Sequence, residues 1–107
     1  MAVKKRPQTA AEYVDLVDQA IFELEELRMA AEYDMESLGN AMNFVDELEK
    51  QMRALRASMA DGSYKFGRDD LPFMDIVRKY DDDVLPFRFL FQMINDTHKL
   101  GLDVGED

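Results

Sequence analysis

The only histidine of the chain, His98, is the first side chain to consider for acid–base chemistry. A catalytic histidine needs a nucleophile or a paired acid within hydrogen-bonding reach. Asn95, Asp96 and Thr97 directly precede it, but on a helix these side chains point in other directions. We therefore predict no catalytic residue, and we expect His98 to lie at a helix C-terminus, where the helix dipole favours it.

Carboxylates are the second group that could do chemistry, because they can hold metal ions. A di-iron bundle needs Glu-x-x-His pairs on two helices, which a single histidine cannot supply. A calcium loop starting at Asp61 has Phe66 at its sixth position and Pro72 at its twelfth, where glycine and glutamate are required. Residues 69–70 and 81–83 are better explained as helix caps and a solvent-exposed linker than as magnesium ligands. The sequence predicts no metal and no cofactor.

The chain has no cysteine, which excludes a disulfide framework, a thiolate metal site and a thiol nucleophile. It also has no glycine-rich phosphate loop and no nucleophile elbow. The basic residues Lys4, Lys5 and Arg6 are not followed by the apolar stretch of a signal peptide. No apolar run approaches the ~20 residues of a membrane span. We expect a cytoplasmic protein.

One apolar spacing predicts the helices that carry these side chains. It alternates between four and three residues from Tyr13 to Met59, and such a spacing places its members on one stripe of a helix. Thirteen of its fourteen positions are apolar, and the exception is Asp34. Asp34 is exposed, sets the helix register, or is buried beside a base such as Arg28. The stripe consists of Tyr13, Val17, Ala20, Leu24, Leu27, Ala31, Asp34, Leu38, Ala41, Val45, Leu48, Met52, Leu55 and Met59.

Either two helices or one long helix can carry this stripe. Residues 9–12 match a capping box, which starts a helix at about residue 10. Gly39–Asn40 combines a common helix end with a good N-cap and favours a hairpin of helices 10–38 and 41–60. The alternative is one helix of about 50 residues, ~75 Å long, which would need a second chain to cover it. We favour the hairpin because it can close a core within one chain.

The rest of the chain predicts two short helices rich in aromatic residues. Acidic residues followed by Leu-Pro-Phe occur twice, ending at Phe73 and Phe87, and proline is favoured in the first turn of a helix. We therefore expect helices at about 72–80 and 86–100. The predicted fold is all-α, a long acidic helical hairpin with two short aromatic-rich helices, similar to a four-helix bundle. The predicted organisation is a basic disordered arm, a single helical domain and an acidic tail, at residues 1–8, 9–102 and 103–107.

The charge is unevenly distributed. The net charge is −10, and residues 9–49 hold twelve acids against one base, Arg28. Such a field repels nucleic-acid phosphates and anionic lipids and attracts basic partners. We favour the simpler interpretation that the acids form the solvent-exposed face of a helix and keep the protein in solution. We expect no nucleic-acid partner and no membrane partner.

The predicted helix 86–100 is apolar on nearly all sides at its start. It is either the central core helix, or one face with Phe89 and Met93 stays exposed as a docking or dimer surface. The functional prediction is a protein–protein interaction protein without catalytic activity that forms a homodimer. One alternative is a secretion-type chaperone or anti-regulator that binds a basic or amphipathic partner helix, and another is a carboxylate metal-binding or enzymatic helical protein. The predicted interaction residues are Phe89, Met93, Glu12, Asp15, Glu25 and Glu26.

Overall fold

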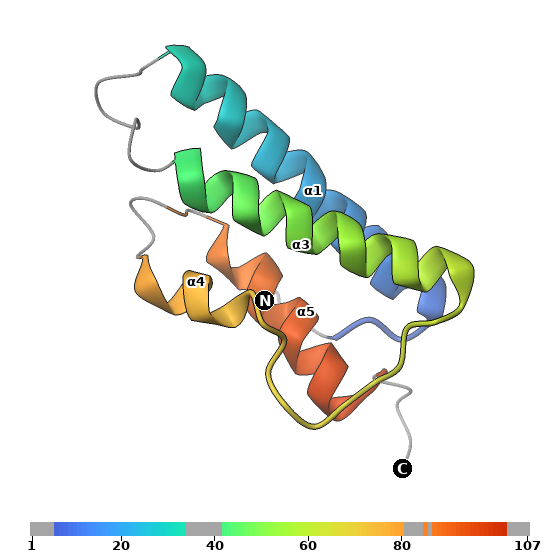
Figure 1. Cartoon of the computed structure of the whole chain (residues 1–107). Helices are drawn as coiled ribbons and strands as arrows, with labels where there is room; N and C mark the ends of the chain where they lie inside the picture. Colours follow the sequence, from blue (N-terminus) through green and yellow to red (C-terminus); the bar gives the residue numbers. More distant parts are fainter. Residues whose placement is uncertain (1–5, 34–41, 81–84, 86, 103–107) are drawn as a thin grey trace, which may run out of the picture.

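The computed structural model describes residues 6–33, 42–80, 85 and 87–102. These residues form helices and no strand: α1 (Ala10–Tyr33), α3 (Met42–Asp61), α4 (Met74–Lys79) and α5 (Arg88–Leu100) (Figure 1). The all-α prediction is therefore confirmed. In this part of the chain, no helix is both long enough and apolar enough to cross a membrane.

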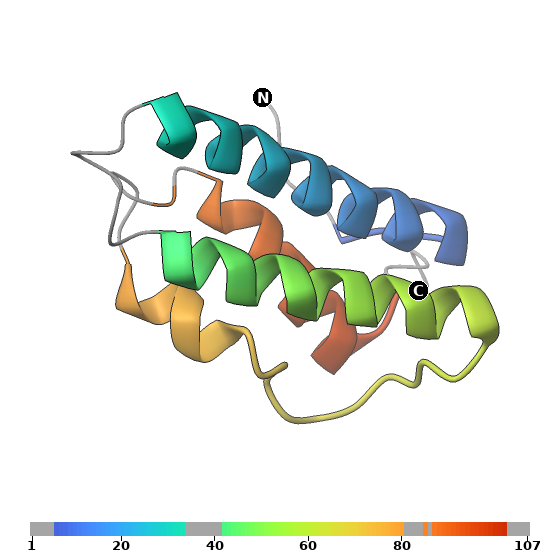
Figure 2. The same cartoon turned by 45° about the horizontal axis from the view of Figure 1, so that its top comes forward.

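The two longest helices, α1 and α3, lie side by side and run in opposite directions (Figures 1 and 2). This arrangement confirms the helical hairpin and excludes a single rod. The second helix of the hairpin spans Met42–Asp61, close to the predicted 41–60. The predicted end of the first helix at residue 38, the break at residues 39–40 and the question of Asp34 lie outside the described residues.

The two short helices begin two residues later than predicted. Before α4 the chain forms a turn, in which the amide of Met74 donates to the carbonyl of Leu71 (3.0 Å) and that of Asp75 to the carbonyl of Pro72 (3.2 Å). Phe73 is the N-cap, and no side chain caps the helix. The expectation that an aspartate before Pro72 acts as a helix cap is therefore wrong for this helix. Residues 81–84 and 86, which precede α5, are outside the described residues.

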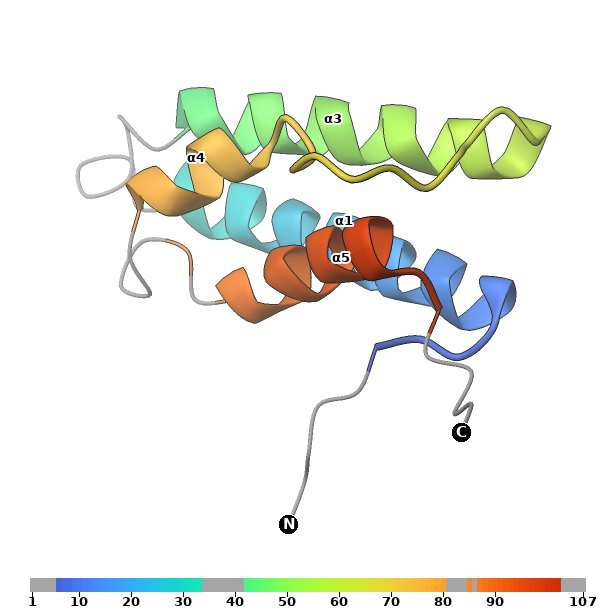
Figure 3. The same ribbon diagram turned by 90° about the horizontal axis from the view of Figure 1, so that it is seen from below.

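The core lies between the hairpin and α5. Most described positions of the 4-3 stripe are buried, from Tyr13 on α1 to Met52 on α3. α5 runs antiparallel to α1 (Figure 3) and covers the stripe with Leu90, Phe91 and Ile94. Each fully buried apolar side chain of this kind contributes roughly 1.5–3 kcal/mol. One chain thus covers most of the described part of the stripe without a second copy.

Ion pairs of arginine residues connect α1 and α3 along one side of the hairpin. Arg28 of α1 pairs with Asp46 (2.5 Å) and Glu49 (2.7 Å) of α3. In the other direction, Arg53 of α3 pairs with Glu25 of α1 and with its own neighbour Glu49. Glu49 and Arg53 have the i,i+4 spacing that favours a pair within one helix, whereas Asp46 pairs across the hairpin. Exposed pairs of this type contribute only about 0–1 kcal/mol each, but they neutralise the acids on this side.

Candidate functional site

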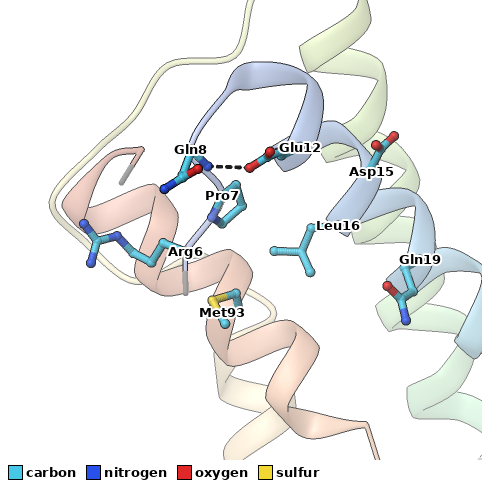
Figure 4. Close-up of a pocket in the computed structure, with 8 residues that line it drawn as sticks. All are labelled: Arg6, Pro7, Gln8, Glu12, Asp15, Leu16, Gln19 and Met93. Atoms are coloured by element: carbon cyan, nitrogen blue, oxygen red, sulfur yellow. Dashed lines mark hydrogen bonds between the residues drawn. The ribbon is translucent and has the colours of Figure 1, made fainter. Parts of the chain in front are cut away.

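A cleft of about 440 Å³ opens between the first half of α1, the segment before it and α5 (Figure 4). Its apolar floor is formed by Leu16 of α1, which points toward Met93 of α5. Both side chains are half-buried. The rim is polar. The full lining is Arg6, Pro7, Gln8, Glu12, Asp15, Leu16, Gln19 and Met93.

The start of α1 contains the Thr9 half of the predicted capping box, while Glu12 bonds one residue before the N-cap instead of to the N-cap amide. The Thr9 hydroxyl accepts a hydrogen bond from the amide of Glu12 (3.1 Å), and the Glu12 carboxylate accepts one from the amide of Gln8 (2.8 Å) (Figure 4). Pro7 is buried, and Arg6 Nε donates to the carbonyl of Gly101 just beyond α5 (3.1 Å). Residues 6–8 therefore lie against α5 and close one end of the cleft.

An acidic row runs along the cleft side of α1. Its members follow one another at spacings of three or four residues, which places them on one side of the helix: Glu12, Asp15, Gln19, Glu23 and Glu26. The four acids of this row form no ion pair with the part of the chain that the structure describes. By contrast, Asp18 pairs with Arg56 (2.8 Å) and Glu25 pairs with Arg53. The structure thus divides the acids of α1 into a neutralised α3 side and a charged α5 side.

An outward row lies on α5, on the side away from the core. Its members have spacings of four, three and four residues: Phe89, Met93, Asp96 and Leu100. Phe89 is 43% exposed and Leu100 is 65% exposed. Phe22 and Met29, farther round α1, are also exposed. The outward row of α5 differs from them because it borders a cleft, through Met93.

Five of the six predicted interaction residues fall on these two rows. Glu12, Asp15 and Met93 line the cleft together, Phe89 lies one helical turn before Met93, and Glu26 ends the acidic row. Glu25 lies apart from them, because it faces α3 and pairs with Arg53.

Sequence reasoning missed several residues of this surface. Leu100 and Glu23 could have been found by extending the helical spacing from Met93 and Glu26. Leu16 lay just outside the 4-3 stripe. The positions of Arg6 and Pro7 depend on a contact between the two ends of the chain, for which the sequence carries no local signal.

A chain of hydrogen bonds near His98 forms a second polar feature. The hydroxyl of Tyr13 donates to the carbonyl of Ile94 (3.1 Å) and lies 3.0 Å from the hydroxyl of Tyr64, which lies 2.7 Å from His98 Nδ1. A hydroxyl has one proton. The hydroxyl proton of Tyr13 is donated to the carbonyl of Ile94. All three hydrogen bonds therefore form together only if Tyr64 donates to Tyr13 and Nδ1–H of His98 donates to Tyr64. The other ring nitrogen, Nε2, then faces Gly67.

Burial favours the uncharged forms of the three side chains in this hydrogen-bonded chain. It lowers the pKa of His98, although the nearby charge of Asp69 acts in the opposite direction. Burial also raises the pKa of Tyr13 far above its usual range. The hydrogen bond with Tyr64 and the electrostatic effect of Tyr64 act in the same direction. His98 does lie in the last turn of α5, as expected. Its partner, however, is Tyr64, so the ring joins the loop after α3 to α5.

The same loop is fixed to α5 at a second point by Asp70. Its carboxylate accepts hydrogen bonds from Asn95 (3.0 Å), Lys99 (2.9 Å) and Arg78 (2.5 Å). These contacts hold the pKa of Asp70 well below its usual range, and the hydrogen bond from Asn95 has the largest effect. The Asn95 side chain also accepts a hydrogen bond from the amide of Leu71 (2.7 Å). Asp70 therefore ties the loop to α4 and α5.

Among the described residues, no group of three or more histidine, aspartate or glutamate side chains is arranged to hold a metal ion. Comparison with protein-family models, with curated proteins and with solved structures finds no match for this chain. Any function must therefore be argued from the surface itself.

Proposed function

We propose that this protein is a binding protein without catalytic activity, and that it binds another protein through the face formed by α1 and α5. The observation that carries the proposal is the exposure of Phe89 and Leu100 on the outward row, next to the cleft at Met93. Apolar side chains that lie exposed together inside a polar rim are typical of protein–protein binding sites. The role requires no catalytic group.

The charge of this face supports a protein partner over other classes. The acidic row of α1 carries carboxylates that are not neutralised by the described residues, and the chain as a whole has a net charge of −10. Phosphates of nucleic acids and anionic lipid headgroups would be repelled. The cysteine-free composition suits a reducing compartment, so we place this interaction in the cytoplasm.

Capture of partners by a tagged protein from native lysate tests the proposal when two matched variants are compared. Phe89→Glu puts a carboxylate on the outward row, and Ala54→Glu puts the same group on an exposed position of α3. We expect a protein captured by the wild type and by Ala54→Glu to be lost with Phe89→Glu. Capture that persists with Phe89→Glu would reject this face as the binding site. So would an equal loss of capture with both variants, when circular dichroism shows that both variants are folded.

A homodimer is the second candidate. The outward row of α5 could pair with the same row of a second copy about a two-fold axis, since an isologous interface uses one patch twice. The repulsion between two copies that each carry a net charge of −10 opposes it. Sedimentation equilibrium distinguishes the 12.4 kDa monomer from a dimer.

A further inference from the structure

The structure points to a particular occupant for the face of α1 and α5. We propose that it binds an amphipathic α-helix of about four turns, with a row of apolar side chains and, beside it, a row of lysines or arginines. This inference rests on the proposed function and adds the chemistry of the partner.

The length and pitch of the two rows argue for a helix. The acidic row extends from Glu12 to Glu26, which corresponds to ~21 Å along α1 at 1.5 Å per residue. The outward row extends from Phe89 to Leu100, or ~17 Å along α5. Because α1 and α5 run antiparallel beside each other, the rows lie along neighbouring helices. A helix placed along them presents its own side chains once per turn, at the same pitch.

Charge complementarity argues for basic residues in one of the partner's rows. On the α3 side of the hairpin, Arg53 and Arg56 neutralise Glu25 and Asp18. On the α5 side, no described base does this for Asp15 or Glu26, although both are exposed. Lysines or arginines of a partner would supply the missing charge at the rim. Such rim pairs set the orientation and association rate, while apolar contacts at the centre supply most of the affinity.

Other occupants fit this face less well. An extended peptide usually binds by adding a strand to a sheet edge, and the described residues contain no strand. A second copy of the chain is itself strongly acidic and would bring carboxylates toward carboxylates. A helix with basic and apolar rows satisfies both parts of the face at once.

A designed peptide provides a direct probe. The Leu/Lys peptide has about 15 residues, with leucines spaced at i, i+4, i+7 and i+11, lysines along one flank and alanines elsewhere. Two further peptides serve as controls, one of identical composition with the rows scrambled and one with glutamates in place of the lysines. Fluorescence anisotropy at about 150 mM salt measures the affinities. We expect the Leu/Lys peptide to bind about tenfold tighter than either control.

Two matched double variants of the protein test where the peptide binds. Asp15→Asn with Glu26→Gln removes two charges from the acidic row, whereas Asp75→Asn with Glu47→Gln removes two exposed charges from α4 and α3. Both double variants have the same net charge. The first should weaken binding of the Leu/Lys peptide about tenfold, and the second by less than about twofold.

Two outcomes would overturn the inference: equal binding of the scrambled peptide, or equal effects of the two double variants. Either would show that a general attraction of bases to an acidic protein suffices. The proposed function fails separately. If the Leu/Lys peptide does not bind but Phe89→Glu still abolishes capture of a protein partner, the face is correct and only the partner chemistry is wrong. If neither experiment depends on this face, both proposals fail.

Discussion

The hydroxyl of Tyr64 lies between Tyr13 and His98, so removing it tests the polar chain. Tyr64→Phe leaves His98 Nδ1 without this partner and should lower the free energy of unfolding by about 1–2 kcal/mol. Chemical denaturation measures the change. Tyr80→Phe is the matched control, because Tyr80 stacks on Phe44 and its hydroxyl makes no hydrogen bond within the described residues. The control should change stability by less than about 0.5 kcal/mol, and equal losses would contradict the assignment.

His98 also gives the protein a defined pH dependence. Burial lowers the pKa of the folded His98 below its ordinary value of 6.5, so the unfolded chain takes up this proton at a higher pH than the folded one. The stability is therefore complete above that ordinary value and falls as the pH drops toward the lowered pKa. Urea unfolding should show this loss just below neutral pH, and His98→Gln should reduce it.

A second titration lies well separated from this one. The pKa of Asp70 is lowered by Asn95, Lys99 and Arg78, so its contribution to stability is lost only as the pH falls below its ordinary value of 3.8. The two windows therefore do not overlap near neutrality. A stability that rises on acidification from neutral pH would contradict the assignment of His98.

The helices show which features of the chain are predictable locally. The 4-3 spacing predicted the helical segments correctly, because helical periodicity depends only on neighbouring residues. The hairpin itself was predicted from Gly39–Asn40 and from the need to close a core within one chain, since the spacing alone also fits one long helix. The start of α4 was placed two residues early, since a proline such as Pro72 suits both a helix start and the turn that is found there. The sequence does not decide which face of α5 is buried, because apolar residues surround its first turn. Packing against α1 decides it.

The division of the acids was even less predictable. Glu25 and Glu26 are neighbours of the same type, yet within the described residues only Glu25 pairs with an arginine. Their difference depends on the register of α1 against α3, which brings Arg53 to one side of α1. No property of either residue alone carries that information. Candidate interaction residues could thus be chosen by exposure and charge, but not sorted by face.

The two faces of α5 are tested by one pair of substitutions. Phe91 is fully buried in the core, so Phe91→Ala should lower the free energy of unfolding by about 3–5 kcal/mol. Phe89 lies on the outward row and is 43% exposed, so Phe89→Ala should lower it by only about 1 kcal/mol. Thermal or chemical unfolding measures both. Similar losses for the two variants would mean that the outward row is part of the core.

Whether the protein is a monomer or a homodimer is a property of the whole molecule. If the second candidate holds, sedimentation equilibrium at about 100 µM gives a dimer mass, corresponding to a dissociation constant in the micromolar range or below. Phe89→Glu should then restore the 12.4 kDa monomer, and Ala54→Glu should leave the dimer intact. A wild-type protein that stays monomeric under these conditions rejects the homodimer and leaves a different protein as the partner.

The central claim is that the face of α1 and α5 is the binding surface of this molecule. A titration of the isotope-labelled protein with the Leu/Lys peptide, followed by two-dimensional NMR, locates the contact residue by residue. We expect the largest chemical-shift changes along the acidic row of α1 and the outward row of α5, including Asp15, Met93 and Leu100, with little change along the exposed side of α3. Changes centred on α3 or α4, or spread evenly over all acidic residues, would contradict the claim.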